Sequence, residues 1–242
     1  MPENIALLHF GEEQLRKRSI GVVEADERLL LHFQITERSM DVLDVFRQMR
    51  TDDENVRVVQ MLGLRMFNAL ACATKLTLSG YYLFGAHILR DVIETVFLVD
   101  LFRTDRGAIT RWRHANDKVS GKEFLPVNVR ITLDKRDGFT SKKREELYKL
   151  FSALAGHPTM ASVAMLRPKG MDAMNGPFVD PNALEANASE MGRLAVQVGE
   201  HIIAFASEDR SEFVLQIVEP ATTFTECKRR WIAKFYSDAV GE

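Results

Sequence analysis

The sequence predicts a mostly α-helical, single-domain bundle of about seven to nine helices, with a small β-hairpin inserted near residues 161–179. Three observations lead to this fold class. Residues 3–125 contain no proline, and proline is excluded from helix interiors because it lacks an N–H and its ring strikes the preceding turn. Apolar residues in that half recur at spacings of three and four, which is typical of amphipathic helices. No change of composition divides the chain, so we expect one domain over residues 1–242.

Long helices are expected in the first half of the chain. Residues 24–50 carry an amphipathic apolar stripe. The segment Thr51-Asp52-Asp53-Glu54 matches a capping box, and it opens a second helix over about 53–79 that ends at Gly80. A third helix over about 81–102 is apolar nearly all round, as expected for a helix at the centre of a bundle.

Shorter elements are expected next along the chain. A fourth helix covers 106–118. Residues 127–133 alternate strictly between apolar and polar, which favours a strand. Pro126 suits the first position of a helix equally well, so both structures stay open for this segment. A helix over about 140–155 then ends at Gly156, because glycine adopts the left-handed conformation that closes helices.

The last third of the chain contains the expected hairpin and two helices. Residues 161–179 lack helical periodicity, and Pro168-Lys169-Gly170 between short apolar runs predicts the hairpin turn. Asp180-Pro181 predicts a helix start, with an N-cap carboxylate followed by proline at the first helical position. That helix is expected over about 180–207. A second capping box opens a last helix over about 223–236.

Charge is balanced overall and unevenly spread. The chain has 32 Lys and Arg against 34 Asp and Glu, a formal net charge of −2, which argues against a nucleic-acid coat protein or a polybasic membrane binder. Residues 103–149 carry a net charge of +6 and residues 171–219 a net charge of −7. We expect the two stretches to pack together and neutralise each other. The alternative is that the basic stretch faces an anionic ligand or nucleic acid.

Cysteine usage and the N-terminus indicate a cytoplasmic protein. Cys72 and Cys227 lie among apolar residues without metal-ligand spacing, so we expect buried free thiols, no metal and no cofactor. The first residues lack a basic segment followed by an apolar core, so no secretory signal is expected. No apolar run reaches the roughly 20 residues of a membrane span, and no membrane partner is expected.

The predicted third helix carries a polar stripe within an apolar helix. Spacings of three and four place its members on one face; they are His87, Arg90, Asp91 and Glu94. Three interpretations stay open. The stripe is the solvent face with an Arg–Glu pair, or it is a buried polar network that binds a small ligand together with Tyr81. The third interpretation is a metal site formed by the histidine and the two carboxylates.

A second candidate site combines Tyr148, Ser152 and His157. Tyr148 and Ser152 lie one helical turn apart, and His157 follows the predicted end of their helix. His157 either interacts with the helix dipole or acts as an acid–base or ligand-contacting group, since the unperturbed pKa of histidine suits proton transfer near neutrality. Acyl transfer by a Ser–His pair is not expected, because Ser152 lies inside a helix without a nucleophile elbow.

The third candidate is the basic segment Arg111-Trp112-Arg113-His114. Arginine beside an aromatic residue binds phosphates and stacks on bases, which makes Arg111 and Arg113 anion-binding candidates. The alternative is an ordinary amphipathic helix with Trp112 anchored in the core. No phosphate-binding glycine loop occurs in the sequence.

Three segments carry a resemblance to a known group of proteins. They are Tyr81–Glu94 with its Arg-x-x-x-Glu pair, Leu147–Pro158, and Gly176-Pro177-Phe178 before the helix that Asp180 opens. Over roughly 60–205, the chain resembles uncharacterised bacterial helical proteins placed near the HEPN superfamily of helical nucleotide-binding and RNase domains. The resemblance implies a helical core that brings the Arg–Glu pair and the histidine together. None of the six histidines follows an arginine by the HEPN ribonuclease spacing, so RNase activity is not implied.

The function expected from these observations is that of a non-catalytic interaction or ligand-binding module. The apolar richness of the long helices predicts a homodimer. The alternative is an RNA- or nucleotide-directed hydrolase, with His157 or His114 as the acid–base group and Arg90, Arg111 or Arg113 holding phosphate.

Overall fold

The computed structural model describes residues 1–115, 122–140, 143–153, 158–167, 170–173, 175–209 and 211–236. The helices in this part of the chain are α1 (Glu3–Ala25), α2 (Glu27–Gln48), α3 (Glu54–Leu78), α4 (Tyr82–Thr104), α5 (Arg106–Arg113), α6 (Pro126–Arg136), α7 (Lys143–Phe151), α8 (Met160–Ala164), α9 (Pro181–Asp209) and α10 (Ser211–Phe235). The described residues form no strand, and the predicted mostly α class is confirmed.

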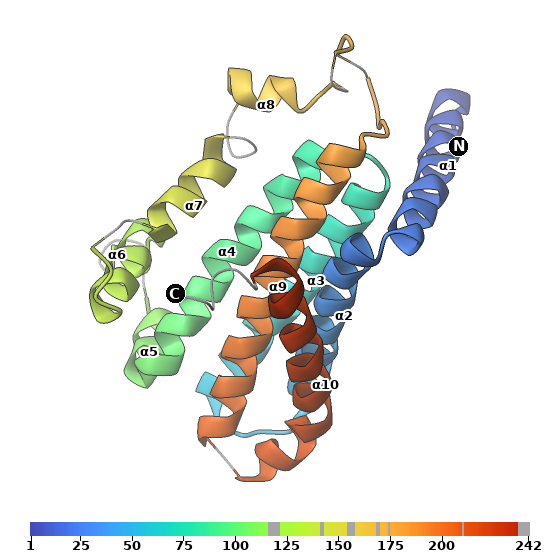
Figure 1. The fold of residues 1–242 in the computed structure, drawn as a ribbon. Helices are drawn as coiled ribbons and strands as arrows, with labels where there is room; N and C mark the ends of the chain where they lie inside the picture. The colour runs from blue at the N-terminus through green and yellow to red at the C-terminus, as the bar shows by residue number, and fades with distance from the viewer. Residues whose placement is uncertain are drawn as a thin grey trace.

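The core is built from long helices that lie side by side (Figure 1). α2 packs on α9, α3 packs on α4, and α4 also packs on α9, while α10 covers α2 and α9. Their shared interior is mostly apolar, and its large buried side chains include Phe46, Phe102, Phe205 and Phe224. The N-terminal part of α1 projects away from this core, and α5 to α8 lie along one side of it (Figure 1).

The apolar helix α3 lies within this bundle. By length and composition alone it is apolar enough to cross a membrane, and half of its most apolar 18-residue segment is buried inside the protein. Val59, Met66 and Leu70 are fully buried there. A core helix of a bundle has the same properties, because it is apolar around much of its circumference.

Aspartates begin three of the long helices. Asp26, Asp53 and Asp180 each accept hydrogen bonds through Oδ1 from the backbone N–H groups two and three residues later, at 2.8–3.4 Å. These bonds satisfy donors that have no partner within the helix. The Asp180-Pro181 start is thereby confirmed. The cap of α3 is Asp53, and the hydroxyl of Thr51 accepts a bond from the Asp53 N–H at 3.1 Å.

Two expectations about the second half of the chain are settled by local hydrogen bonding. Residues 127–133 belong to α6, with Pro126 as the first helical residue. The hairpin expected at 161–179 is not present in the described residues, because Met160–Ala164 forms α8. The side chains of Thr159 and Ser162 cap this helix reciprocally, at 3.1 and 3.0 Å, and the expected turn residues Pro168 and Lys169 lie outside the described part of the chain.

The last helix begins earlier than the sequence predicted. α10 is continuous from Ser211 to Phe235 and contains Pro220, so the segment 223–226 does not start a helix. The hydroxyls of Thr223 and Thr225 donate to the carbonyls of Pro220 and Ala221 at 3.1 and 2.7 Å. Threonine hydroxyls that bond backward inside a helix are not available to cap backbone N–H groups.

Two close backbone approaches fix how the helices meet. Gly80 ends the turn between α3 and α4 at a φ of +83°, where a Cβ atom would lie 2.4 Å from the carbonyl oxygen of Phe178. Only glycine adopts this conformation readily and leaves room for that carbonyl. The hydroxyl of Tyr82 then accepts a hydrogen bond from the Asp180 N–H at 3.2 Å. The start of α9 is therefore tied to the start of α4.

A buried histidine joins α2 to α10. The indole Nε1–H of Trp231 donates to Nδ1 of His32 at 2.9 Å, and the His32 ring stacks on Phe235 with 4.2 Å between centroids. Burial is the main reason that the pKa of His32 falls to about 4. His32 is 2% exposed, and its neutral form is the one that leaves Nδ1 free to accept the bond.

Candidate anion-binding site

The polar stripe of α4 is divided among several partners. Arg90 Nε lies 3.3 Å from Glu94 Oε1, whereas Asp91 accepts a bidentate pair of bonds from Arg65 of α3. Tyr81 donates its hydroxyl hydrogen to Glu12 of α1 at 2.6 Å. The structure therefore separates Tyr81 and Asp91 from the Arg90–Glu94 pair.

Arg90 faces the tyrosine of the second candidate site. Its Nη2 donates to the hydroxyl oxygen of Tyr148 on α7, and its Cζ lies 4.9 Å from the ring centroid. Arg130 of α6 lies over the same ring, with its Cζ 3.9 Å from the centroid. Each such contact between a guanidinium and an aromatic face contributes about 0.5–2 kcal/mol. We refer to Arg90, Arg130 and Tyr148 as the guanidinium cluster.

Arg130 is the most unusual member of the guanidinium cluster. Its side chain is 7% exposed, and its Nη1 is buried without a hydrogen-bond partner. Among the described residues no carboxylate forms an ion pair with Arg130. Within the described part of the chain, Glu94 is the one carboxylate paired with the cluster, so the two guanidiniums leave a local charge of +1 there. A buried, uncompensated charge costs several kcal/mol, so this arrangement calls for an anion.

Arg130 was not among the site residues predicted from the sequence, although a signal for it was present. If residues 126–136 are taken as a helix, Val129 and Leu133 form an apolar stripe, and both are buried. Arg130 directly follows Val129 and borders that stripe, which is an uncommon place for a solvated arginine. The strand interpretation of 127–133 instead assigned Arg130 to the polar face.

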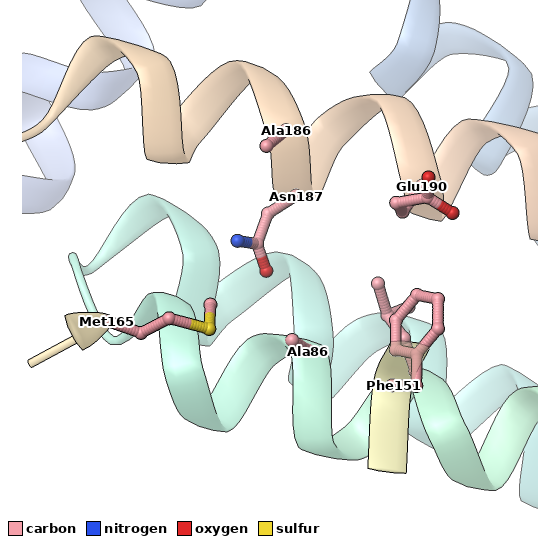
Figure 2. A pocket seen from close by; sticks show the side chains of 7 residues that line it. Ala86, Phe151, Met165, Ala186, Asn187 and Glu190 are labelled. Atoms are coloured by element: carbon pink, nitrogen blue, oxygen red, sulfur yellow. The ribbon is translucent and has the colours of Figure 1, made fainter. Parts of the chain in front are cut away.

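A small cavity lies between α4 and α9 (Figure 2). It has a volume of about 80 Å³ and is lined by Ala86, Leu89, Phe151, Met165, Ala186, Asn187 and Glu190. Figure 2 shows the amide of Asn187 directed from α9 toward α4, with Phe151 and Met165 on either side. Two buried oxygens near this space have no partner, Oδ1 of Asn187 and Oγ of Ser152.

A charge network around Asp100 holds α6 and α7 on α4. Asp100 is 2% exposed and accepts a bidentate pair of bonds from Arg136 at 2.9 Å each. Arg144 of α7 bonds to Asp134 at 2.7 Å and also to Asp137. Hydrogen bonds from Arg136, ahead of that from Arg144, lower the pKa of Asp137 to about 2. The network thereby positions the helices that carry Arg130 and Tyr148.

The other candidate anion-binding residues are paired with carboxylates. Arg111 bonds to Asp105 at 2.8 Å and to Glu123 at 2.7 Å. Arg113 is paired with Glu54. The ring Nδ1 of His114 lies 2.8 Å from the carbonyl oxygen of Thr110 in its own helix. A phosphate at this segment would therefore compete with carboxylates already bound there.

The basic and acidic stretches of the chain meet where α4 and α5 face α9. Arg103 pairs with Glu208 at 3.2 Å, and Arg106 pairs with the same carboxylate at 3.6 Å. His201 of α9 lies 3.6 Å from Asp100. Arg111 and Arg144 instead pair with acids within the basic stretch.

The remaining candidates are placed as follows. Ser152 lies one turn after Tyr148, His87 is exposed on α4, and His157 lies outside the described residues. Within the described part of the chain, no three His, Cys, Asp or Glu side chains come together to hold a metal. No protein-family model, curated protein or solved structure matches the chain.

Proposed function

We propose that the protein is a non-catalytic module that binds a small anion at the guanidinium cluster. The observation that carries this proposal is the burial of Arg130 with one guanidinium nitrogen unpartnered. A folded protein without a ligand bears the cost of that buried charge, and an anion that binds there removes the cost. The ligand-binding function expected from the sequence is thereby narrowed to one site.

The donors around Arg130 suit a carboxylate or a phosphate. Guanidinium groups present N–H donors in a planar arrangement that matches these anions. The Ser152 hydroxyl, which directly follows α7 and is buried and unpartnered, is a candidate for a further donor. Tyr148 holds the guanidinium planes by ring contact, so that little side-chain entropy is lost when the anion binds.

The homodimer and the hydrolase stay separate proposals. An RNA- or nucleotide-directed hydrolase would use His157 or His114 as its acid–base group. The arginines nearest to His114 are engaged by carboxylates, whereas Nη1 of Arg130 has no partner. These contacts favour binding of a small anion at α6 and α7.

The test compares Arg130→Gln with Arg229→Gln, a matched change at an exposed arginine on α10. Affinity for acetate and inorganic phosphate is measured by calorimetry at low ionic strength. We expect Arg130→Gln to weaken binding by roughly 10- to 150-fold, the range for loss of a charged hydrogen bond, and Arg229→Gln to leave it unchanged.

The stability of the ligand-free variants provides an independent check. Removal of an uncompensated buried charge is expected to leave the melting temperature of Arg130→Gln equal to or above that of the wild type. The result is the opposite if the role of Arg130 is purely structural. Its loss would lower the melting temperature, and neither anion would bind to the wild type.

A further inference from the structure

The outward face of α1 carries a line of side chains that is complementary to itself. We infer that α1 pairs with α1 of a second copy of the chain, in antiparallel orientation, along this line. We call it the α1 seam, and its members are Glu3, Leu7, Phe10, Gln14 and Lys17. The inference goes beyond the anion-binding function and does not depend on it.

The α1 seam faces away from the rest of the protein. Nine residues, or two and a half helical turns, separate Phe10 from the buried Ser19, so these side chains lie on opposite sides of α1. Leu7 is 62% exposed and Phe10 is 65% exposed. A Cβ atom at Gly21, one turn after Lys17, would meet nothing within 4 Å. Because α1 also lies at the edge of the bundle in Figure 1, the seam is open to a partner.

The spacing of the α1 seam is that of a coiled coil. Its members follow one another at intervals of four, three, four and three residues. This average of 3.5 keeps a line of side chains turned toward one partner helix. Leu7 and Phe10 are the apolar pair of the seam, and their removal from water would supply most of the association energy.

The charges of the α1 seam identify a second copy as the partner. Glu3 lies one turn before Leu7, and Lys17 lies two turns after Phe10, so one end of the seam is acidic and the other is basic. An antiparallel pair of identical helices brings unlike ends together. A parallel pair would bring like charges together, and these repel. The seam is therefore complementary to itself in the antiparallel orientation.

The apolar pair sets the register of the two helices. With the twofold axis between residues 8 and 9, Leu7 faces Phe10 of the partner subunit, as an a residue faces a d residue in a coiled coil. Glu3 then faces Gln14 of the partner subunit, and the partner subunit's Lys17 lies one turn further on. Long side chains lean toward the N-terminus of their own helix, so this glutamate and this lysine lean toward each other. The dimer has two such ion pairs.

Sedimentation equilibrium at low ionic strength tests the pairing, because salt screens exposed ion pairs. Glu3→Lys and Lys17→Glu each replace two ion pairs by two repulsive contacts. Each variant alone is expected to dimerise about 30-fold more weakly than the wild type. Glu226→Lys makes the same charge change at an exposed residue of α10, and it is expected to dimerise like the wild type. A wild type that stays monomeric at millimolar concentration would overturn the inference.

A mixture of the two seam variants provides the second comparison. In an antiparallel pair of one chain of each, both ends again join a positive to a negative side chain, so the mixture is expected to recover the affinity of the wild type. A mixture that dimerises no better than its components would overturn the register. If Glu3→Lys and Lys17→Glu alone dimerise like the wild type, the antiparallel orientation is overturned, because a parallel pair already opposes like charges. Circular dichroism of each variant verifies that its helix content is unchanged.

Discussion

The contact between α9 and α10 at Gly199 gives a sharp prediction for stability. A Cβ atom at this position would lie 2.3 Å from Cε2 and 2.4 Å from Cζ of Phe224. Phe224 is 1% exposed, so its ring cannot swing into solvent to make room. Gly199→Ala therefore forces either the ring or the whole of α10 to shift.

The net cost follows from two opposing terms. Inserting a methyl group into a packed core costs about 1–3 kcal/mol, or more where the overlap is severe. Replacing glycine by alanine inside a helix stabilises the helix by about 1 kcal/mol. A cost of about 3 kcal/mol for the methyl group, less the gain of about 1 kcal/mol from alanine, leaves a net destabilisation of about 2 kcal/mol. For a chain of this size it corresponds to a fall in the melting temperature of roughly 4–8 °C.

Urea denaturation followed by circular dichroism measures this difference. Gly21→Ala is the matched control, because Gly21 also lies in a helix and a Cβ atom there has nothing within 4 Å. We expect Gly21→Ala to raise the free energy of unfolding by up to about 1 kcal/mol. A Gly199→Ala protein as stable as Gly21→Ala would refute the argument. Phe224→Leu introduced into Gly199→Ala should recover part of the loss.

Two further predictions concern pH and association. The folded-state pKa of His32 is about 4 against 6.5 in the unfolded chain, so the free energy of unfolding should fall by about 3 kcal/mol as the pH falls from 6.5 to 4. Urea midpoints across this range measure the loss, and a similar slope in His32→Asn would contradict it. The proposed homodimer is assigned to the exposed face of α1 that carries Leu7 and Phe10. Light scattering should give twice the chain mass of 27.5 kDa for the wild type and the chain mass for Phe10→Glu, whereas a monomeric wild type would refute the assignment.

Strong local signals in the sequence predicted the start of α9 and the course of α4. Asp180-Pro181 combines a capping carboxylate with a proline that needs no partner for its missing N–H. The segment 127–133 was left open because its alternation fits a strand while Pro126 fits a helix, and in the structure it is helical, with Val129 and Leu133 buried. α1 was not predicted, because only Ser19 and Val23 of its residues are buried and its apolar residues do not form one stripe.

Sequence spacing predicted one part of the candidate site. Arg90 and Glu94 lie one turn apart on a single helix, so sequence spacing alone brings them together. Arg130 was missed because residues 127–133 were left open between a strand and a helix, and Asp100 was missed because its partners come from helices far apart in the sequence. Arg136 reaches Asp100 across 36 residues, and no periodicity of either segment encodes that contact.

The attachment of α6 and α7 has a consequence for how an anion reaches the guanidinium cluster. These two helices pack mainly on α4 and on each other, and they contribute Val129, Leu133 and Phe151 to the main core. Moving them outward as one unit would part Tyr148 from Arg90 and lift Phe151 from the cavity in a single step. The bonds of Arg136 to Asp100 would have to break for this movement, and the three core side chains would become exposed as the cluster opened.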